Sequence, residues 1–130
     1  MATVNSTLTL TSSDLTSDSI SLSVLNTLAS ATQGGISRVK LATTAIAGAT
    51  VLAPASKFTE GARVWLFNPA TTASAANTVH VSLDEAAGTI PLNAGDWAVI
   101  PWSASTRTTD KNLEAYGGSA DLIIEFGVFQ

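Results

Sequence analysis

Apolar side chains recur at every second residue in several segments of this chain, and this period constrains the fold more than any other feature. A period of two places alternate side chains on opposite faces of a β-strand, whereas an α-helix would distribute them around its axis. Turn-forming residues separate the apolar segments at intervals of roughly 8 to 15 residues. We therefore predict an all-β fold, a single antiparallel β-sandwich or jelly roll with an extended N-terminal arm. The alternation is clearest in segments 7–10, 19–24, 35–41 and 78–83.

The chain has 130 residues, a length that fits one sandwich without covalent crosslinks. A polar stretch over residues 12–19 separates the N-terminal residues from the rest. We predict that residues 1–18 form an N-terminal arm or first strand and that residues 19–130 form the β-sandwich domain. The arm, about residues 2–13, is expected to add as a strand to a partner's sheet edge or to be the first strand of its own sandwich.

Three segments are apolar on both faces, namely 63–67, 96–102 and 121–129. A sandwich strand has one face toward water, so a second apolar face must be covered by a loop, an arm or another subunit. The chain has little spare material for this, and we expect another subunit to cover part of it. The interface candidates lie in these segments and in the arm: Leu8, Leu10, Trp65, Phe67, Ile100, Trp102, Ile123 and Phe129.

Composition also favours contacts with protein. Charged residues make up 12% of the chain and hydrophobic residues 45%, so small hydroxyl and methyl groups must form much of the surface. Such groups lose little side-chain entropy in a contact. The net charge of −4 and the six scattered basic residues argue against a nucleic-acid partner. No apolar run approaches the ~18 residues of a membrane span, so no membrane partner is expected.

The chain contains few residues that could act as a nucleophile or a general base. The chain has no cysteine and one histidine, His80, which the alternation places on the outward face of a strand. Most nucleophile–base pairs therefore cannot be built. Four carboxylates, Asp84, Glu85, Asp96 and Asp110, lie in predicted turns, where such side chains bond to the local backbone. We expect a protein that is not an enzyme, with no catalytic, cofactor-binding or metal-binding residue.

Aromatic residues leave a carbohydrate-binding role open. Trp65, Trp97 and Trp102 could stack on sugar rings, and Trp102 is the strongest candidate of the three. Trp65 and Trp97 lie in the middle of strands, where packing in the core or in an interface is the simpler interpretation.

Five parts of the sequence together resemble a known family. They are a Thr/Ser/Leu-rich N-terminus and segments 35–39, 63–68, 93–102 and 123–129. With these features the chain resembles small virion structural proteins of tailed phages, especially cyanophages.

The resemblance implies a β-sandwich or jelly-roll subunit that is made in the host cytoplasm and incorporated into the virion. The first expectation is a capsid decoration (cement) subunit that forms a homo-oligomer, such as a trimer, and binds the major capsid protein. One alternative is a tail, connector or fibre component that binds tail proteins. Another is a carbohydrate-binding β-sandwich module that contacts a host glycan.

Overall fold

The structure is a computed structural model that describes residues 2–14, 19–58, 61–83, 89–103 and 112–130. The chain divides into two compact units, Met1–Thr32 and Gln33–Gln130. These described residues contain strands and two short 3-10 helices, η1 (Ala55–Lys57) and η2 (Ala75–Asn77). No helix in them is long and apolar enough to cross a membrane.

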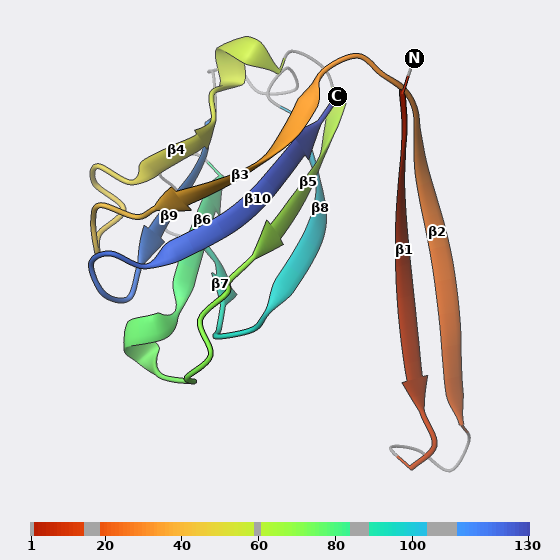
Figure 1. Ribbon diagram of the computed structural model, residues 1–130, viewed down its shortest axis with the longest axis horizontal. Coiled ribbons are helices and arrows are strands. Elements are labelled where there is room, and N and C mark those ends of the chain that lie inside the picture. Colours follow the sequence, from red (N-terminus) through yellow and green to blue (C-terminus); the bar gives the residue numbers. More distant parts are fainter. Residues whose placement is uncertain (1, 15–18, 59–60, 84–88, 104–111) are drawn as a thin grey trace. The chain divides into compact units, whose positions relative to one another are not determined.

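The N-terminal unit is a β-hairpin. Strand β1 (Ala2–Ser12) pairs antiparallel with β2 (Ile20–Ala31), and the two lie side by side along their length (Figure 1). The pairing runs from Ala2 opposite Ala31 to Ser12 opposite Ile20, with one irregularity between Ala2 and Val4. A lone two-stranded hairpin is marginally stable in water.

The second unit is a two-layer sandwich of four-stranded sheets, with strand orders β3-β10-β5-β8 and β4-β9-β6-β7 (Figure 1). Every paired strand is antiparallel. The strands are β3 (Gly34–Lys40), β4 (Thr50–Ala53), β5 (Gly61–Phe67), β6 (Val79–Leu83), β7 (Thr89–Leu92), β8 (Trp97–Ser103), β9 (Leu113–Gly117) and β10 (Ile123–Phe129).

The strand pairing is nested. The first sandwich strand, β3, pairs with the last, β10, and the pairs β4–β9, β5–β8 and β6–β7 follow inward. Two four-stranded sheets connected in this way form a jelly roll. The predicted all-β sandwich or jelly roll is confirmed.

The core lies between the two sheets and is built by alternation along the strands. In β5, Val64 and Leu66 are fully buried, while Trp65 between them is not. Buried aliphatic side chains from both sheets meet there, among them Leu41, Val79, Val81, Leu113, Ala115, Ile124 and Val128.

The arrangement of the N-terminal region differs from the prediction in two ways. The segment 19–24, predicted to belong to the sandwich domain, lies almost wholly in β2 and pairs with β1. β1 is therefore not the first strand of the sandwich, and the division between the units falls after residue 32, not after residue 18. Alternation identifies a strand and its two faces, but it does not identify the neighbouring strand.

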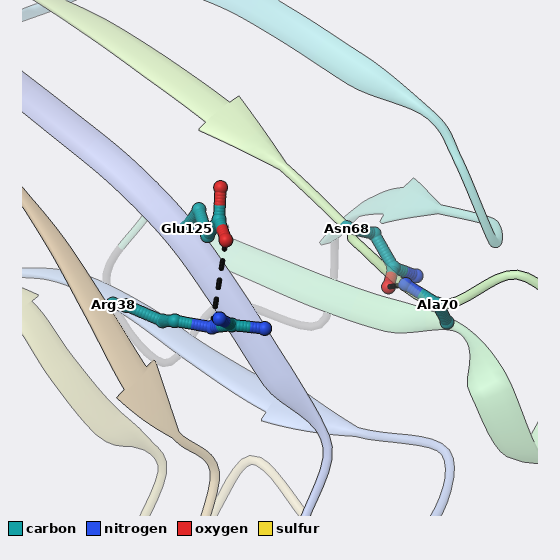
Figure 2. Close-up of polar contacts among 4 residues, drawn as sticks. All are labelled: Arg38, Asn68, Ala70 and Glu125. Carbon is teal, nitrogen blue, oxygen red and sulfur yellow. Dashed lines mark hydrogen bonds and ion pairs between the residues drawn. The ribbon is translucent and has the colours of Figure 1, made fainter.

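A buried asparagine holds together the end of the sandwich where β5 stops. Asn68 is fully buried, and its Nδ2 donates hydrogen bonds to the carbonyl oxygens of Asn77 and Leu92, both at 2.8 Å. Its Oδ1 accepts a hydrogen bond from the Ala70 backbone N–H at 3.1 Å (Figure 2). One side chain thus links the segment after β5, the turn before β6 and the end of β7.

Candidate functional site: two apolar surfaces

The outer face of the β3-β10-β5-β8 sheet carries a set of apolar side chains. Because Val64 and Leu66 point into the core, Trp65 and Phe67 of the same strand point to the outer face. In the neighbouring edge strand β8, the outward residues lie opposite these two. Phe67 pairs with Trp97, and Trp65 pairs with Val99.

The set continues across the other half of the sheet. Gly127 of β10 lies between Trp65 of β5 and Ile36 of β3, and Phe129 follows two residues later on the same face. We call this surface the aromatic face and define it by six residues: Ile36, Trp65, Phe67, Trp97, Val99 and Phe129.

The aromatic face is exposed at both of its edges. Ile36 is 71% exposed, Trp97 54% and Val99 39%. At its centre the rings of Trp65 and Phe67 stack with centroids 6.2 Å apart and planes inclined by 20°. A contiguous apolar patch of this kind on a sheet marks a contact surface more often than a face meant for water.

Two glycines let Phe129 lie against the sheet. A Cβ atom at Gly127 would come within 2.9 Å of the Phe129 ring, and one at Gly34 within 2.7 Å of Phe129 Cδ1. The ring therefore occupies space that a side chain at either position would need.

Charged pairs border the aromatic face on the β3 side. Arg38 Nε lies 3.4 Å from Glu125 Oε1, and the two residues are cross-strand partners on β3 and β10 (Figure 2). Lys40 and Asp121 form a second pair, with 3.0 Å between Nζ and Oδ1. An apolar centre with a charged rim is the usual organisation of a protein interface.

The Arg38–Glu125 pair should contribute little to folding, because the Arg38 side chain is 61% exposed. We expect Arg38→Ala to lower the free energy of unfolding by less than about 1 kcal/mol, and chemical denaturation would measure this. A loss well above that value would show that the pair, and not packing, holds β3 against β10.

The hairpin has two unlike faces. Residues directly opposite each other on β1 and β2 share a face, and Leu8 lies opposite Val24 while Leu10 lies opposite Leu22. We define the aliphatic face as Val4, Leu8, Leu10, Ile20, Leu22, Val24 and Leu28; the polar pair Ser6 and Asn26 and the residue Ser12 lie on the same side of the hairpin. The other face, called the hydroxyl face, carries Asn5, Thr7, Thr9, Thr11, Ser21, Ser23 and Thr27, with Leu25 as the one large apolar residue among them.

The structure brings most of the predicted interface residues together on these two surfaces. Leu8 and Leu10 lie on the aliphatic face and are 39% and 49% exposed. Trp65, Phe67 and Phe129 lie on the aromatic face. Ile123 lies on the same side of the sheet, half-buried, opposite Lys40.

Ile100 and Trp102 were wrongly assigned to an outer surface. Trp102 is 6% exposed, belongs to the core, and packs edge-on against Phe58 with ring centroids 5.7 Å apart. Ile100 is half-buried and packs against the same core. The stronger carbohydrate candidate, Trp102, therefore has no open face to offer a sugar.

Sequence reasoning missed Val99 and Ile36, and it left Trp97 open between packing in the core and packing in an interface. The segment 96–102 is apolar on both faces, so its alternation gives two equivalent assignments. The pairing of Trp97 with Phe67 would have shown which face of this strand points outward, but the sequence does not reveal which strands are neighbours.

Of the polar candidates, His80 and Asp96 lie within the described residues, and each makes a local contact. His80 lies on the outer face of β6 between buried valines, as predicted, and its ring stacks on Tyr116 at 4.9 Å between centroids. Asp96 accepts a hydrogen bond from the Asn93 backbone N–H at 2.9 Å, which is a local turn contact. Asp84, Glu85 and Asp110 lie outside the described residues. Within the described part of the chain, no three His, Cys, Asp or Glu residues could together hold a metal ion.

Comparison with known proteins gives no match: no family model, no curated protein and no solved structure matches this chain.

Proposed function

We propose that this chain is a structural subunit of a homo-oligomeric assembly, and within that class a capsid decoration (cement) protein of a tailed phage. The observation that carries the proposal is the aromatic face, on which Ile36, Trp97 and Val99 are 39–71% exposed. In this role the face binds a neighbouring copy or the major capsid protein. The subunit is made in the host cytoplasm and ends in the virion. The phage assignment itself comes from the sequence resemblance.

The physics of the aromatic face suits a permanent protein contact. Burying a tryptophan removes ~150–250 Å² from water, and Trp is enriched among the residues that dominate interface energy. Trp65 and Trp97 both lie on this face. The jelly-roll fold is compatible with the proposal, since capsid proteins use it, but lectins and enzymes use it too.

Within the virion, a tail, connector or fibre subunit is the alternative, because the same face could bind a tail protein. A carbohydrate-binding module is the second candidate, favoured by the stacked pair of Trp65 and Phe67 beside Trp97. Sugar sites add convergent polar groups to such a platform. Glu125, which lies opposite Phe67, forms an ion pair with Arg38. This pairing leaves fewer polar groups for a sugar and makes this candidate the weaker one.

Sedimentation of the full chain over a range of concentrations tests the proposal. We expect wild type to form species larger than one chain. We expect the double variant Trp97→Ser/Val99→Ser to associate at least ~100-fold more weakly, because it removes the two large exposed apolar side chains that β8 contributes to the face. Val51→Ser is the matched control, since Val51 is 46% exposed but lies on edge strand β4 of the other sheet.

The two candidate classes give different results in one further measurement. A carbohydrate-binding module would remain a monomer, and its tryptophan fluorescence would shift when soluble oligosaccharides are added. An oligomer with no such shift supports the assembly role. Equal association of wild type and the double variant would contradict a contact through the aromatic face.

A further inference from the structure

The β3 edge of the β3-β10-β5-β8 sheet offers a contact that uses main-chain groups. Within the described residues β3 pairs with β10 alone, so its other side is an open sheet edge with backbone N–H and C=O groups. We propose that β3 of one subunit pairs antiparallel with β3 of a second copy of this chain, around a two-fold axis at Ser37. This pairing joins two four-stranded sheets into one continuous sheet. The contact goes beyond the proposed function, because it uses a sheet edge and not the aromatic face.

Comparison of the four edge strands of the sandwich singles out β3. Edge strands β7 and β8 contain Pro91 and Pro101, and a proline within a sheet turns its nitrogen, which carries no hydrogen, toward the open edge. Edge strand β4 has four residues, and its pairing shifts register between Val51 and Ala53. Proline, short length and irregular pairing all protect a sheet edge against a further strand. In contrast, β3 has seven residues, contains no proline and pairs with β10 without a register shift.

The two charged side chains of β3 are balanced within the subunit. Charged side chains can also protect a sheet edge. However, Arg38 Nε lies 3.4 Å from Glu125 Oε1 of β10 (Figure 2). Lys40 Nζ lies 3.0 Å from Asp121 Oδ1, two residues before β10 begins. Both charges therefore have a carboxylate on the β10 side of β3, away from the open edge.

The hydrogen-bond pattern with β10 decides which groups of β3 face the open edge. Gln33 and Gln130 each donate a backbone hydrogen bond to the other's carbonyl oxygen, at 3.0 and 2.9 Å, so they are a hydrogen-bonded pair. In an antiparallel ladder such pairs alternate with pairs whose backbone groups point away. Every second residue from Gln33 onward therefore faces β10, and the residues between them face the open edge. The residues that face the open edge are Gly34, Ile36, Arg38 and Lys40.

One register engages all four of these residues. When Ser37 lies opposite Ser37 of the second copy, Ile36 lies opposite Arg38. Gly34 then lies opposite Lys40, and the ladder forms ~8 main-chain hydrogen bonds, which supply the affinity in strand addition. A register centred on Arg38 would place two arginines directly opposite each other, which is unfavourable. A register centred on Ile36 would leave Lys40 opposite a residue outside β3.

Gly35 has no structural reason to be a glycine within the subunit. A Cβ atom there would meet nothing within 4 Å, and Gly35 is not among the glycines with positive φ. Glycine inside a strand weakens it, and it often marks a place where another backbone approaches closely. In the proposed register Gly35 lies opposite Val39 of the second copy, in a pair without direct hydrogen bonds, where side chains come closest. A glycine at this position gives the branched valine side chain room.

The pairing also extends the aromatic face across two subunits. Residues opposite each other in a ladder share a face, so both aromatic faces lie on the same side of the joined sheet. Ile36, which is 71% exposed at this edge, then lies diagonally across the axis from Ile36 of the second copy, and such diagonal neighbours are within reach of long side chains. The contact therefore covers part of the most exposed end of the aromatic face.

Disulfide crosslinking of the full chain tests the contact and its register. The chain has no cysteine, so each single-cysteine variant reports on one position. Under mild oxidation we expect Ser37→Cys to form covalent dimers, because residue 37 lies opposite itself in a pair whose Cα atoms are ~4.5 Å apart, within the range of a disulfide.

Gly35→Cys is the matched control for Ser37→Cys. Both positions are exposed on the same face of β3, but the two copies of residue 35 lie about four residues apart along the ladder, which is ~13 Å. We therefore expect few dimers of Gly35→Cys. Dimers of Gly35→Cys as abundant as those of Ser37→Cys, or no dimers of Ser37→Cys, would overturn the inference.

A proline at the open edge gives a second test, by sedimentation. The Trp97→Ser/Val99→Ser background isolates the edge contact, since it should keep the dimer and lose the association beyond it. In this background we expect Ile36→Pro to weaken dimerisation at least ~100-fold, because both copies lose a hydrogen bond and gain a ring at the edge. The Ile36 N–H faces the open edge, so the pairing with β10 keeps its hydrogen bonds. Ile36→Ser, which keeps the N–H, should weaken dimerisation less than ~10-fold; equal effects of the two substitutions would contradict strand pairing.

The two proposals can fail separately. Ser37→Cys dimers that persist in the Trp97→Ser/Val99→Ser background support the edge contact even where the aromatic face fails its own test. Association that the Trp97→Ser/Val99→Ser substitutions weaken, with no Ser37→Cys dimers, would overturn the edge contact and leave the proposed function standing.

Discussion

Replacing Asn68 by alanine is expected to lower the free energy of unfolding by about 3 kcal/mol. The substitution removes both Nδ2 hydrogen bonds, to the carbonyl oxygens of Asn77 and Leu92, and the Oδ1 acceptor of the Ala70 N–H. The Asn68 side chain and its hydrogen bond to the Leu92 carbonyl are buried, and the other two hydrogen bonds are partly buried. Water therefore cannot easily replace the partner that Leu92 loses, and an unsatisfied buried backbone group costs about 1–3 kcal/mol. For a domain of this size the thermal midpoint should fall by roughly 12–24 °C, measurable by calorimetry.

Asn77→Ala serves as the control for this prediction. Its Nδ2 also donates to one backbone carbonyl, that of Thr72 at 2.8 Å, but this hydrogen bond is exposed. We expect a loss below about 1 kcal/mol, because water replaces an exposed partner. Similar losses in the two variants would mean that burial of the Asn68 network is not what stabilises this end of the sandwich.

The second large effect is expected at Gly118, which follows β9. A Cβ atom there would overlap the carbonyl oxygen of Ala75 in η2 and would also lie 3.1 Å from its carbonyl carbon. Both are backbone atoms, so no side-chain rotation relieves the overlap. The Gly118 N–H also donates to the Thr78 carbonyl at 2.7 Å, which holds the glycine in place. Gly118→Ala should therefore cost about 2–3 kcal/mol of unfolding free energy, as measured by denaturant titration.

Gly35→Ala is the comparison for Gly118→Ala. A Cβ atom at Gly35 would meet nothing within 4 Å, and alanine restricts the unfolded chain more than glycine does. We expect this variant to be as stable as wild type or slightly more stable. A loss of 2 kcal/mol or more at Gly35, or none at Gly118, would contradict the packing described for these two positions.

The alternation in the sequence predicted that Val64 and Leu66 lie on one face of a strand and Trp65 and Phe67 on the other, and the structure places the first two inside and the second two outside. It also placed His80 on an outer face and Leu8 with Leu10 on one side of a strand. These predictions depend only on the period of two and on the cost of exposing aliphatic side chains, and both act within a single segment.

Strand partners, in contrast, were decided by the tertiary structure. Segment 19–24 alternates as a sandwich strand would, yet it lies almost wholly in β2 and completes a hairpin with β1. Trp102 became a core residue and Trp97 a surface residue because pairing with β5 fixes which face of β8 points inward. Local patterning limits the side chains of each strand to two faces, but long-range contacts decide which face points into the core. The same contacts bring Ile36, Trp65 and Gly127, which are far apart in the sequence, onto one face of the sheet. No single segment of the sequence encodes these contacts.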